Sequence, residues 1–228
     1  MEVALVSVGD ELLTGDTVNT NATWLGERLD GRGVDVERVT VVPDRVADIA
    51  RVVNEYAAEY DTVIVTGGVG PTHDDMTMEG VAAAVGCPLE TNEVALEWLG
   101  EERGYARSDL TDGTGELPAG ARPLHNTAGV APGCVVENVY VLPGVPEEMK
   151  AMFESIESEF DGETRYTGHV VVDEPESALL DRFEELQERF DVTVGSYPGE
   201  TIRVKIKGTD EESVEAALAW LEANSDTV

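Results

Sequence analysis

The sequence predicts an α/β protein: a three-layer αβα fold around a mostly parallel sheet, followed by a small α+β domain. The first observation is that short apolar runs alternate with amphipathic segments through most of the chain, a pattern typical of a parallel sheet with helices on its faces. The second is a composition shift near residues 161–164, after which a shorter pattern of strands and helices begins. A length of 228 residues suits two domains, and we expect them over residues 1–162 and 163–228.

Three strands are expected first, at residues 3–8, 34–42 and 62–65, and the first of them is expected to be buried on both faces. A loop is expected after the first strand, as far as about Val18. Apolar residues at helical spacing predict one helix over residues 19–32 and another that opens at Asp44. This succession of strands and helices implies parallel strands, and ligands bind beyond the carboxyl ends of such strands.

The remaining elements follow from the same reasoning. The first domain should also contain helices at 79–85, 93–103 and 147–156, a polar, glycine-rich loop at 105–118, and two short strands within 135–142. The second domain should contain strands at 168–172, 192–195 and 202–206, with helices at 175–190 and 210–223.

The charge balance excludes two classes of partner. Lys and Arg number 15 against 47 Asp and Glu, a formal net charge of −32. Nucleic acid and anionic membrane are therefore not expected as partners, because both require clustered basic side chains. A hydrophobic content of 42% argues against disorder. Acid excess with scarce lysine suits concentrated salt, where screening relieves self-repulsion, so we expect a halophilic origin.

The N-terminus and the cysteines indicate a cytoplasmic protein. The first residues lack the basic region of a signal peptide, and no apolar stretch approaches the roughly 20 residues needed to cross a bilayer. Cys87 and Cys134 lack the paired spacing of a zinc site, and two cysteines are too few for a disulfide framework in a chain of this size. We therefore expect a soluble, unexported protein.

A glycine-rich loop directly follows the third strand. Residues 66–77 read Thr-Gly-Gly-Val-Gly-Pro-Thr-His-Asp-Asp-Met-Thr and lead into the helix expected at 79–85. Glycines let the backbone approach a ligand, successive N–H groups can form an anion-binding concavity, and a helix N-terminus favours phosphate. The loop matches neither of the common nucleotide-binding patterns. We interpret it as a cradle for phosphate or carboxylate; the alternative is a plain turn in which Asp74 or Asp75 caps the helix.

Acidic residues follow the same strands. Asp10 and Glu11 come after the first strand, Asp44 after the second and Asp75 within the glycine-rich loop. Because parallel strands place their carboxyl ends side by side, these four carboxylates are expected to converge beside the cradle. Carboxylates repel a phosphate unless a cation mediates, and oxygen ligands suit magnesium or manganese. The alternative is that each acid is a solvated loop residue or a helix cap.

A Pro-Gly-x-Pro turn at residues 143–146 precedes the helix expected at 147–156. The turn either aims backbone N–H groups at a ligand or serves as a rigid connection between strand and helix. Pro143 and Gly144 are therefore candidate ligand-binding residues.

Four segments carry a family resemblance: residues 9–15 with 19–21, 66–77, 131–133 and 142–149. They resemble the competence/damage-inducible protein A (CinA) family, whose core is a MoaB/Mog-type molybdopterin-binding domain. The resemblance covers nearly the whole chain. It implies that the second domain is KH-like and that the amidohydrolase domain of many CinA proteins is absent from this chain. The G-x-x-G clamp for nucleic acid is also missing from the second domain.

The resemblance also implies roles for individual residues. In that superfamily the loop that corresponds to Gly67, Gly68 and Gly70 holds the phosphate end of a pterin or nucleotide. Asp75 and Asp44 match its functional acids, and Asp10 matches a carboxylate of a metal-dependent step. CinA-type domains are associated with cleavage of the pyrophosphate of ADP-ribose.

We therefore expect a Mg²⁺-dependent nucleotide pyrophosphatase that cleaves ADP-ribose or a related dinucleotide. The catalytic residues would be Asp75 and Asp44, and the metal ligands Asp10, Glu11, Asp44 and Asp75. The ligand-binding residues would be Gly67, Gly68, Gly70, Thr72, Asp74, Thr77, Pro143 and Gly144. One alternative is a non-catalytic protein that binds molybdopterin in the same pocket, and another is an oligomeric scaffold with a vestigial site. Residues 115–117 lack the Gln-Ala pair of the family pattern, and this departure keeps the scaffold alternative open. The partners expected are a small-molecule nucleotide or pterin and further copies of the chain in a homo-oligomer.

Overall fold

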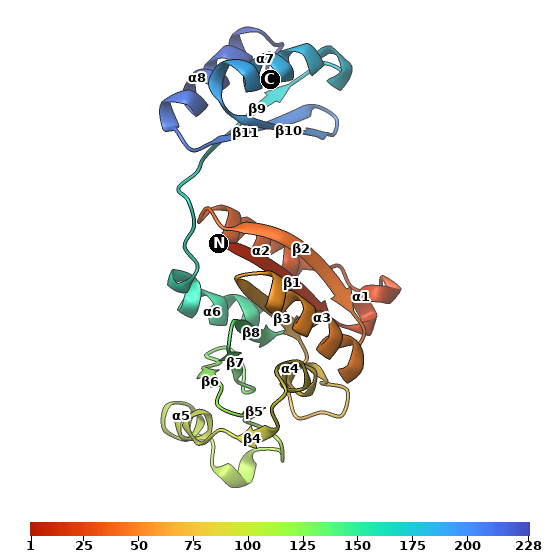
Figure 1. Cartoon of the computed structure of the whole chain (residues 1–228), viewed down its shortest axis with the longest axis vertical. Coiled ribbons are helices and arrows are strands. Elements are labelled where there is room, and N and C mark those ends of the chain that lie inside the picture. The colour runs from red at the N-terminus through yellow and green to blue at the C-terminus, as the bar shows by residue number, and fades with distance from the viewer. The chain divides into compact units, whose positions relative to one another are not determined.

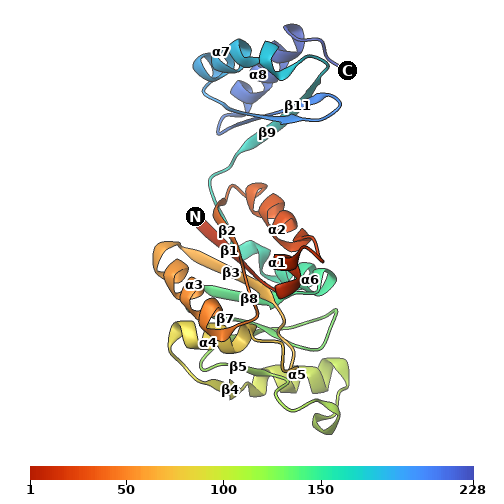
Figure 2. The same ribbon diagram turned by 90° about the vertical axis from the view of Figure 1, so that its right-hand side faces the viewer.

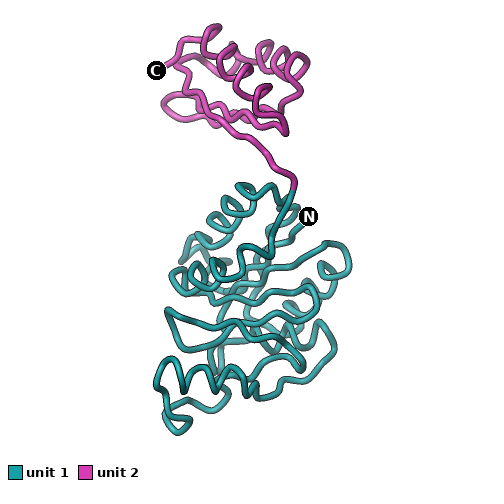
Figure 3. The backbone as a smooth tube through the Cα atoms, turned by 90° about the vertical axis from the view of Figure 1, so that its left-hand side faces the viewer, with its two compact units in different colours: residues 1–162 teal, residues 163–228 magenta.

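The computed structural model describes residues 1–228, which form two compact units, residues 1–162 and 163–228 (Figure 3). The first unit contains a six-stranded sheet in the order β2-β1-β3-β8-β7-β6 and a two-stranded sheet, β4-β5 (Figure 1). The second contains a three-stranded sheet in the order β10-β11-β9. A mostly parallel sheet flanked by helices, with a smaller antiparallel sheet towards the C-terminus, confirms the predicted fold class.

The large sheet is parallel where the site is expected. The parallel strands are β1 (Glu2–Val8), β2 (Asp35–Val42), β3 (Thr62–Gly67) and β8 (Val139–Pro143); β7 (Gly133–Val136) and β6 (Arg122–Leu124) extend the sheet in antiparallel fashion. Gly67 at the end of β3 pairs with Pro143 at the end of β8. The strand ends that carry the predicted ligand-binding residues therefore lie side by side.

Helices cover both faces of this sheet, which makes three layers (Figure 2). The helices α3 (Val46–Glu59) and α4 (Thr77–Val85) pack on one face, and α2 (Thr20–Asp30) and α6 (Pro146–Ile156) pack on the other. Along β3, Val63 and Val65 join the first core and Ile64 joins the second, because successive strand residues point to opposite faces. Burying each such side chain stabilises the fold by roughly 1.5–3 kcal/mol.

Residues 10–18 were expected to form a loop, and that prediction is wrong in part. A short helix, α1 (Asp10–Thr14), begins directly after Gly9 and ends at Gly15, whose φ of 79° is left-handed. None of its residues is buried, so the helix leaves no apolar periodicity in the sequence. The helix expected to open at Asp44 instead begins at Val46, because the Asp44 carboxylate accepts a hydrogen bond from the Asp10 N–H and does not cap the helix.

The segment between α4 and β7 differs from the expected loop as well. After α5 (Glu93–Arg103) come a 3₁₀ turn, η1 (Arg107–Asp109), and a strand, β5 (Glu116–Pro118), which pairs with β4 (Leu89–Thr91). Strands this short carry too few residues for alternation to identify them. After α6 a second 3₁₀ turn, η2 (Glu157–Glu159), ends the first unit's helical structure.

The second unit is an antiparallel sheet with helices packed against one core. Its strands are β9 (Tyr166–Val172), β10 (Thr193–Pro198) and β11 (Ile202–Gly208), and its helices are η3 (Glu176–Ala178), α7 (Leu180–Phe190) and α8 (Glu211–Ala223). The helix expected at 175–190 is thus divided into a 3₁₀ turn and α7. None of the helices in the chain combines the length and the apolar composition that a membrane span requires.

Candidate functional site

A pocket of about 660 Å³ lies beyond the carboxyl ends of β3 and β8. Three segments and one helix residue line most of it: the glycine-rich loop over residues 67–71 with Asp75, the turn over residues 143–145, residues 129–131, and Glu148 from α6. Further residues come from the segment that follows α5: Tyr105, Asp109, Leu110, Thr111 and Thr114. The pocket therefore joins residues from distant parts of the chain at the edge where the parallel sheet predicts a ligand.

The Asp75 carboxylate fills the space left by two glycines. A Cβ on Gly70 would lie 2.7 Å from Asp75 Oδ2, and a Cβ on Gly68 would collide with Asp75 Oδ1. The Thr72 N–H donates to Asp75 Oδ2 at 3.3 Å, and the Thr72 hydroxyl donates to the same oxygen. These glycines are needed because the backbone must pass directly against a carboxylate, so loop and acid form one structural feature.

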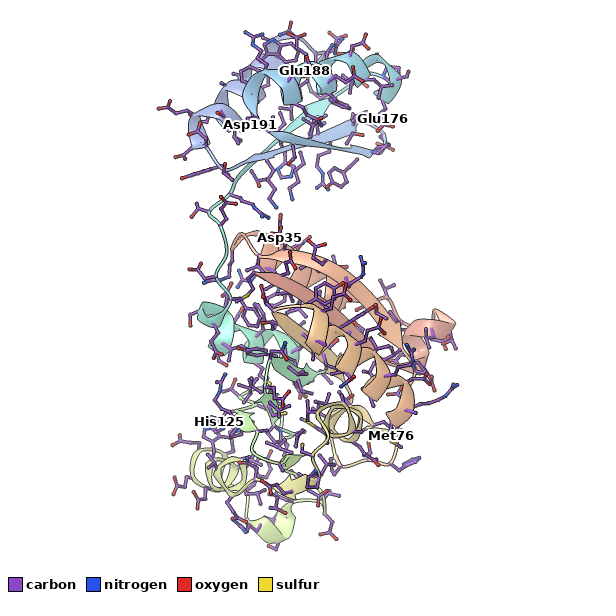
Figure 4. The ribbon with its side chains drawn as sticks, viewed as in Figure 1. Asp35, Met76, His125, Glu176, Glu188 and Asp191 are labelled. Carbon is purple, nitrogen blue, oxygen red and sulfur yellow. The ribbon has the colours of Figure 1, made fainter.

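The first turn of α4 offers unused polar groups beside the loop. The Thr77 side chain is 0% exposed, and its hydroxyl has no hydrogen-bond partner. Met76, labelled in Figure 4, is the N-cap residue of α4, and no side chain caps the helix there. Unpaired N–H groups and the helix dipole at such a terminus favour an anion, in keeping with a phosphate-binding role for this turn.

A second group of acids lies at the ends of β1 and β2. The Asp44 carboxylate accepts a hydrogen bond from the Asp10 N–H at 2.9 Å. Burial raises the pKa of Asp44, the hydrogen bond from Asp10 lowers it, and the charges of Asp10, Glu11 and Asp74 raise it further. The net shift is upward, so Asp44 is an acid held among like charges and is well suited to bind a cation or to accept a proton.

The structure brings only some of the predicted site residues into the pocket. Those that line it are Gly67, Gly68, Gly70, Asp75, Pro143 and Gly144. Thr72 and Thr77 contact the loop from outside the pocket lining, through Asp75 and Gly67 respectively. Asp74 and Asp10 are exposed, and they interact electrostatically with Asp44.

Glu11 lies apart from the main pocket. Its carboxylate folds over the α-carbon of Gly9, where a Cβ would lie 2.5 Å from Glu11 Oε1. It lines a separate cavity of about 80 Å³ together with Asn21 and Gly144. The Asn21 Nδ2 donates to the Gly144 carbonyl at 2.7 Å and fixes the turn between the two cavities.

The four predicted metal ligands do not form a ready coordination cluster. No group of three or more His, Cys, Asp or Glu side chains in the structure is arranged to hold a metal ion. Asp75 belongs to the pocket, whereas Asp10, Glu11 and Asp44 belong to the neighbouring strand ends. Carboxylate oxygens are the ligands that Mg²⁺ prefers, and water molecules usually complete its coordination shell. Because the four carboxylates are not gathered in one cluster, the magnesium site stays a prediction.

Two segments that line the pocket have no role predicted from the sequence. One is the part of the chain over residues 105–114. The other is Gly129, Val130 and Ala131, and Asn126 holds their loop by accepting hydrogen bonds from the Ala128 and Gly129 N–H groups at 3.2 and 2.7 Å. Glu148 lies in the motif at 142–149 but was given no role. Asn126 carried no signal because a single asparagine in a loop is indistinguishable from a turn residue.

Comparisons with known proteins agree with this arrangement. Residues 4–160 match the family described as a probable molybdopterin binding domain, and residues 164–227 match the middle domain of FAD synthase. A protein of Archaeoglobus fulgidus is 37% identical over 224 residues, which cover 97% of each chain. A protein of Pyrococcus horikoshii is 38% identical over 238 residues, which cover 96% of this chain and 93% of that protein.

Among solved structures, this chain is similar to the protein CinA of Thermoplasma acidophilum, whose function is described as unknown. The two are 36% identical, the match covers 71% of this chain and 99% of that chain, and the TM-score is 0.64. The similarity confirms the family resemblance of the sequence motifs.

Proposed function

Because this chain belongs to the molybdopterin-binding-domain family and is CinA-like, we propose that it is a metal-dependent nucleotide pyrophosphatase that hydrolyses ADP-ribose or a related dinucleotide. The match of residues 164–227 to a domain of FAD synthase adds FAD, itself a dinucleotide with a pyrophosphate bridge, to the candidate substrates. The pocket volume of about 660 Å³ is within the range of small-molecule sites.

One electrostatic observation carries the proposal. The pocket combines a phosphate-type glycine loop with three carboxylates, Asp75, Asp109 and Glu148, and no Lys or Arg lines it. A pyrophosphate beside Asp75 would be repelled by the carboxylate and would find no basic side chain to neutralise it. A bound divalent cation would remove this repulsion, and the oxygens of carboxylates such as Asp75 would be suitable ligands for it.

In the proposed reaction a water oxygen forms a bond to one phosphorus of the pyrophosphate. The bond from that phosphorus to the bridging oxygen breaks, and the bridging oxygen leaves with the electron pair on the other phosphate. ADP-ribose and water thus give AMP and ribose 5-phosphate. A bound cation would polarise the phosphoryl group and lower the pKa of the attacking water.

The residues of this chain have distinct tasks in that reaction. The loop at 67–70 and the first turn of α4 supply backbone N–H groups for phosphate oxygens, while Asp75 is held rigidly by Thr72. Asp44 is the acid best suited to accept the proton of the water, because its raised pKa makes it a stronger base than an ordinary aspartate.

The test is chromatographic detection of AMP after incubation with ADP-ribose, and with FAD in parallel, in molar KCl. We expect AMP with Mg²⁺ and none in EDTA. Protein that is folded by circular dichroism but forms no AMP from either compound, with Mg²⁺, Mn²⁺ or Co²⁺, would contradict the proposal.

A second candidate function is binding of molybdopterin without hydrolysis. It is favoured by the apolar part of the pocket wall, where Val69, Leu110 and Val130 suit a planar ring system. Purified protein would then carry the absorbance and fluorescence of a pterin, and a protein without these signals would count against it.

A further inference from the structure

We propose that Glu148 recognises the hydroxyl groups of a ribose and so selects ribosyl phosphates over their deoxy analogues. This inference rests on the proposed function, since it specifies the ligand class of the same pocket, but binding alone can test it. Glu148 adds to the negative charge of the pocket, but neither the phosphate contacts nor the proton transfer of the proposed hydrolysis is assigned to it.

Glu148 lies in the motif at 142–149, but neither the motif nor the resemblance implies a role for it. It lies in the first turn of α6, is half-buried and lines the pocket. Its carboxylate packs against the α-carbon of Gly129, where a Cβ would lie 2.6 Å from Glu148 Oε1. A larger residue at position 129 would displace the carboxylate, because the carboxylate takes up the space of a side chain.

Asn126 fixes the direction of this carboxylate. Asn126 is 1% exposed, and its Nδ2 donates to Glu148 Oε2 at 2.6 Å and to the Ala131 carbonyl at 2.9 Å. Its Oδ1 accepts the two loop N–H groups of Ala128 and Gly129. The hydrogen-bonding capacity of Asn126 is therefore used in full, and Glu148 is locked in one orientation.

The second oxygen of Glu148 has no donor from the protein. The hydrogen bonds of this carboxylate are accounted for by Asn126 at Oε2, and no Lys or Arg lines the pocket. An ionised carboxylate only accepts hydrogen bonds, and a partly buried acceptor is stabilised when a ligand supplies a donor. The pocket thus presents a fixed acceptor on a different wall from the glycine cradle.

The chemistry of the acceptor selects the ligand group. A phosphate would be repelled by Glu148, so phosphates should bind at the cradle and leave this wall to another part of the ligand. The Watson–Crick edge of adenine offers one donor, the N6 amino group, beside the acceptor N1. A carboxylate that accepts from N6 is repelled by the lone pair of N1. A ribose offers adjacent hydroxyl donors a few bonds from the phosphate, and acidic side chains bind ribose hydroxyls in this way in other nucleotide sites.

The variant Glu148→Gln separates recognition from structure. Its Oε1 can still accept the hydrogen bond of Asn126, so the wall should stay folded, whereas its amide presents a donor where the carboxylate presented an acceptor. Glu147→Gln is the matched control: Glu147 lies in the same helical turn, is exposed and does not line the pocket. Both variants remove one negative charge from the same helix terminus.

The experiment is calorimetric titration with two pairs of probes in the presence of Mg²⁺: AMP against 2′-deoxy-AMP, and ribose 5-phosphate against 2-deoxyribose 5-phosphate. None of these contains a pyrophosphate, so hydrolysis does not interfere. The wild-type protein and Glu147→Gln should bind the ribo member of at least one pair roughly 10-fold or more tightly than its deoxy member. Glu148→Gln should bind both members of that pair about equally, with an unchanged melting temperature.

The inference is overturned if the wild-type protein does not discriminate within either pair, if it binds none of the probes, or if Glu148→Gln discriminates as well as the wild-type protein. These results are distinct from failure of the proposed function. Discrimination without AMP formation from dinucleotides would contradict hydrolysis alone, and AMP formation without discrimination would contradict the role of Glu148 alone.

Discussion

The two sheets of this protein differ in where their loops lead. The parallel strands β2, β1, β3 and β8 end at one edge, so segments from distant parts of the sequence meet there. Asn21, at the start of α2, and Gly144 are 123 positions apart and are joined by a 2.7 Å hydrogen bond. The antiparallel strands β10, β11 and β9 end at alternating edges. A parallel sheet therefore gathers polar residues for chemistry, whereas the antiparallel sheet keeps consecutive loops apart.

The two units also differ in how their surroundings shift the pKa of an acidic side chain. Burial and neighbouring carboxylates raise the pKa of Asp44 in the first unit. In the second, hydrogen bonds from Arg182 and the Asp226 N–H lower the pKa of Glu174, whose two oxygens accept from the guanidinium at 2.8 and 3.0 Å. An acid whose carboxylate oxygens all accept hydrogen bonds from cationic or N–H donors stabilises a fold. An acid held among like charges is typical of a functional site.

The largest expected effect is a loss of turnover when Asp75 is replaced, with no such loss when a carboxylate of the second unit is replaced. Asp75→Asn removes the charge held in the glycine loop, and turnover of ADP-ribose should fall by about 10²–10⁴-fold. The matched control is Asp210→Asn, because Asp210 caps α8 by accepting the Ser213 N–H at 2.8 Å and asparagine caps helices equally well. Chromatographic rates of AMP formation check both variants, and equal rates for the two would refute the contrast.

A smaller loss is expected from Gly68→Ala. The new methyl group would collide with the Asp75 carboxylate and displace it, which should weaken binding of ADP-ribose by roughly 10–100-fold. Gly26→Ala is the control, since Gly26 lies within α2 and a Cβ there has no heavy atom within 4 Å. That control should stabilise the protein by about 0.5–1 kcal/mol. Titration and thermal unfolding measure the two effects, and unchanged affinity of Gly68→Ala would be the contrary result.

Arg182→Gln should lower the melting temperature by a few degrees at pH 7, because it removes the bidentate partner of Glu174. Since the pKa of Glu174 is lowered in the folded state, its contribution to stability is present above the ordinary value of 4.5 and is lost as the pH falls through the folded pKa. The difference in melting temperature from the wild-type protein should therefore shrink in acid. A difference independent of pH would show that the pair does not act through its charges.

The smallest expected effect is a slight rise in melting temperature when Asp44 is replaced, opposite in sign to the change expected for Arg182→Gln. The pKa of Asp44 is raised, so its contribution to stability is present below the ordinary value of 3.8 and is lost as the pH rises through the folded pKa. In metal-free buffer at pH 7, Asp44→Asn should raise the melting temperature slightly, and the gain should vanish below about pH 4. Thermal unfolding in EDTA across this range provides the measurement; a fall in melting temperature at pH 7 would contradict it.

Much of the first unit could be predicted because its signals are local. The buried runs of β1 and β3 and the apolar spacing of α2 and α3 identify a parallel sheet with helices on both faces. The helix α1 could not be predicted, because none of its five residues is buried and they leave no apolar periodicity. An acid beside an apolar pattern is typical of a helix cap and predicts that α3 starts at Asp44, and only the contact with Asp10 shows otherwise.

In the candidate site, too, some residues could be predicted from local sequence and others could not. Loop composition and strand order predicted the glycine cradle and Asp75, and both line the pocket. The wall formed by residues 126–131 and Glu148 depends on a hydrogen bond between side chains 22 positions apart, which no local pattern records. Nothing in the sequence could indicate that Glu11 lies over Gly9 beside a separate cavity.

The sequence by itself determined the fold class, the family and the chemical character of the loops, because periodicity, glycine content and charge act over short stretches of chain. Tertiary structure alone decided which polar groups share a pocket. The register between Gly67 and Pro143, the burial of Asn126 and the like charges around Asp44 arise only when distant segments pack together. Electrostatic and hydrogen-bond energies depend on distances of a few ångströms, and the folded backbone sets those distances.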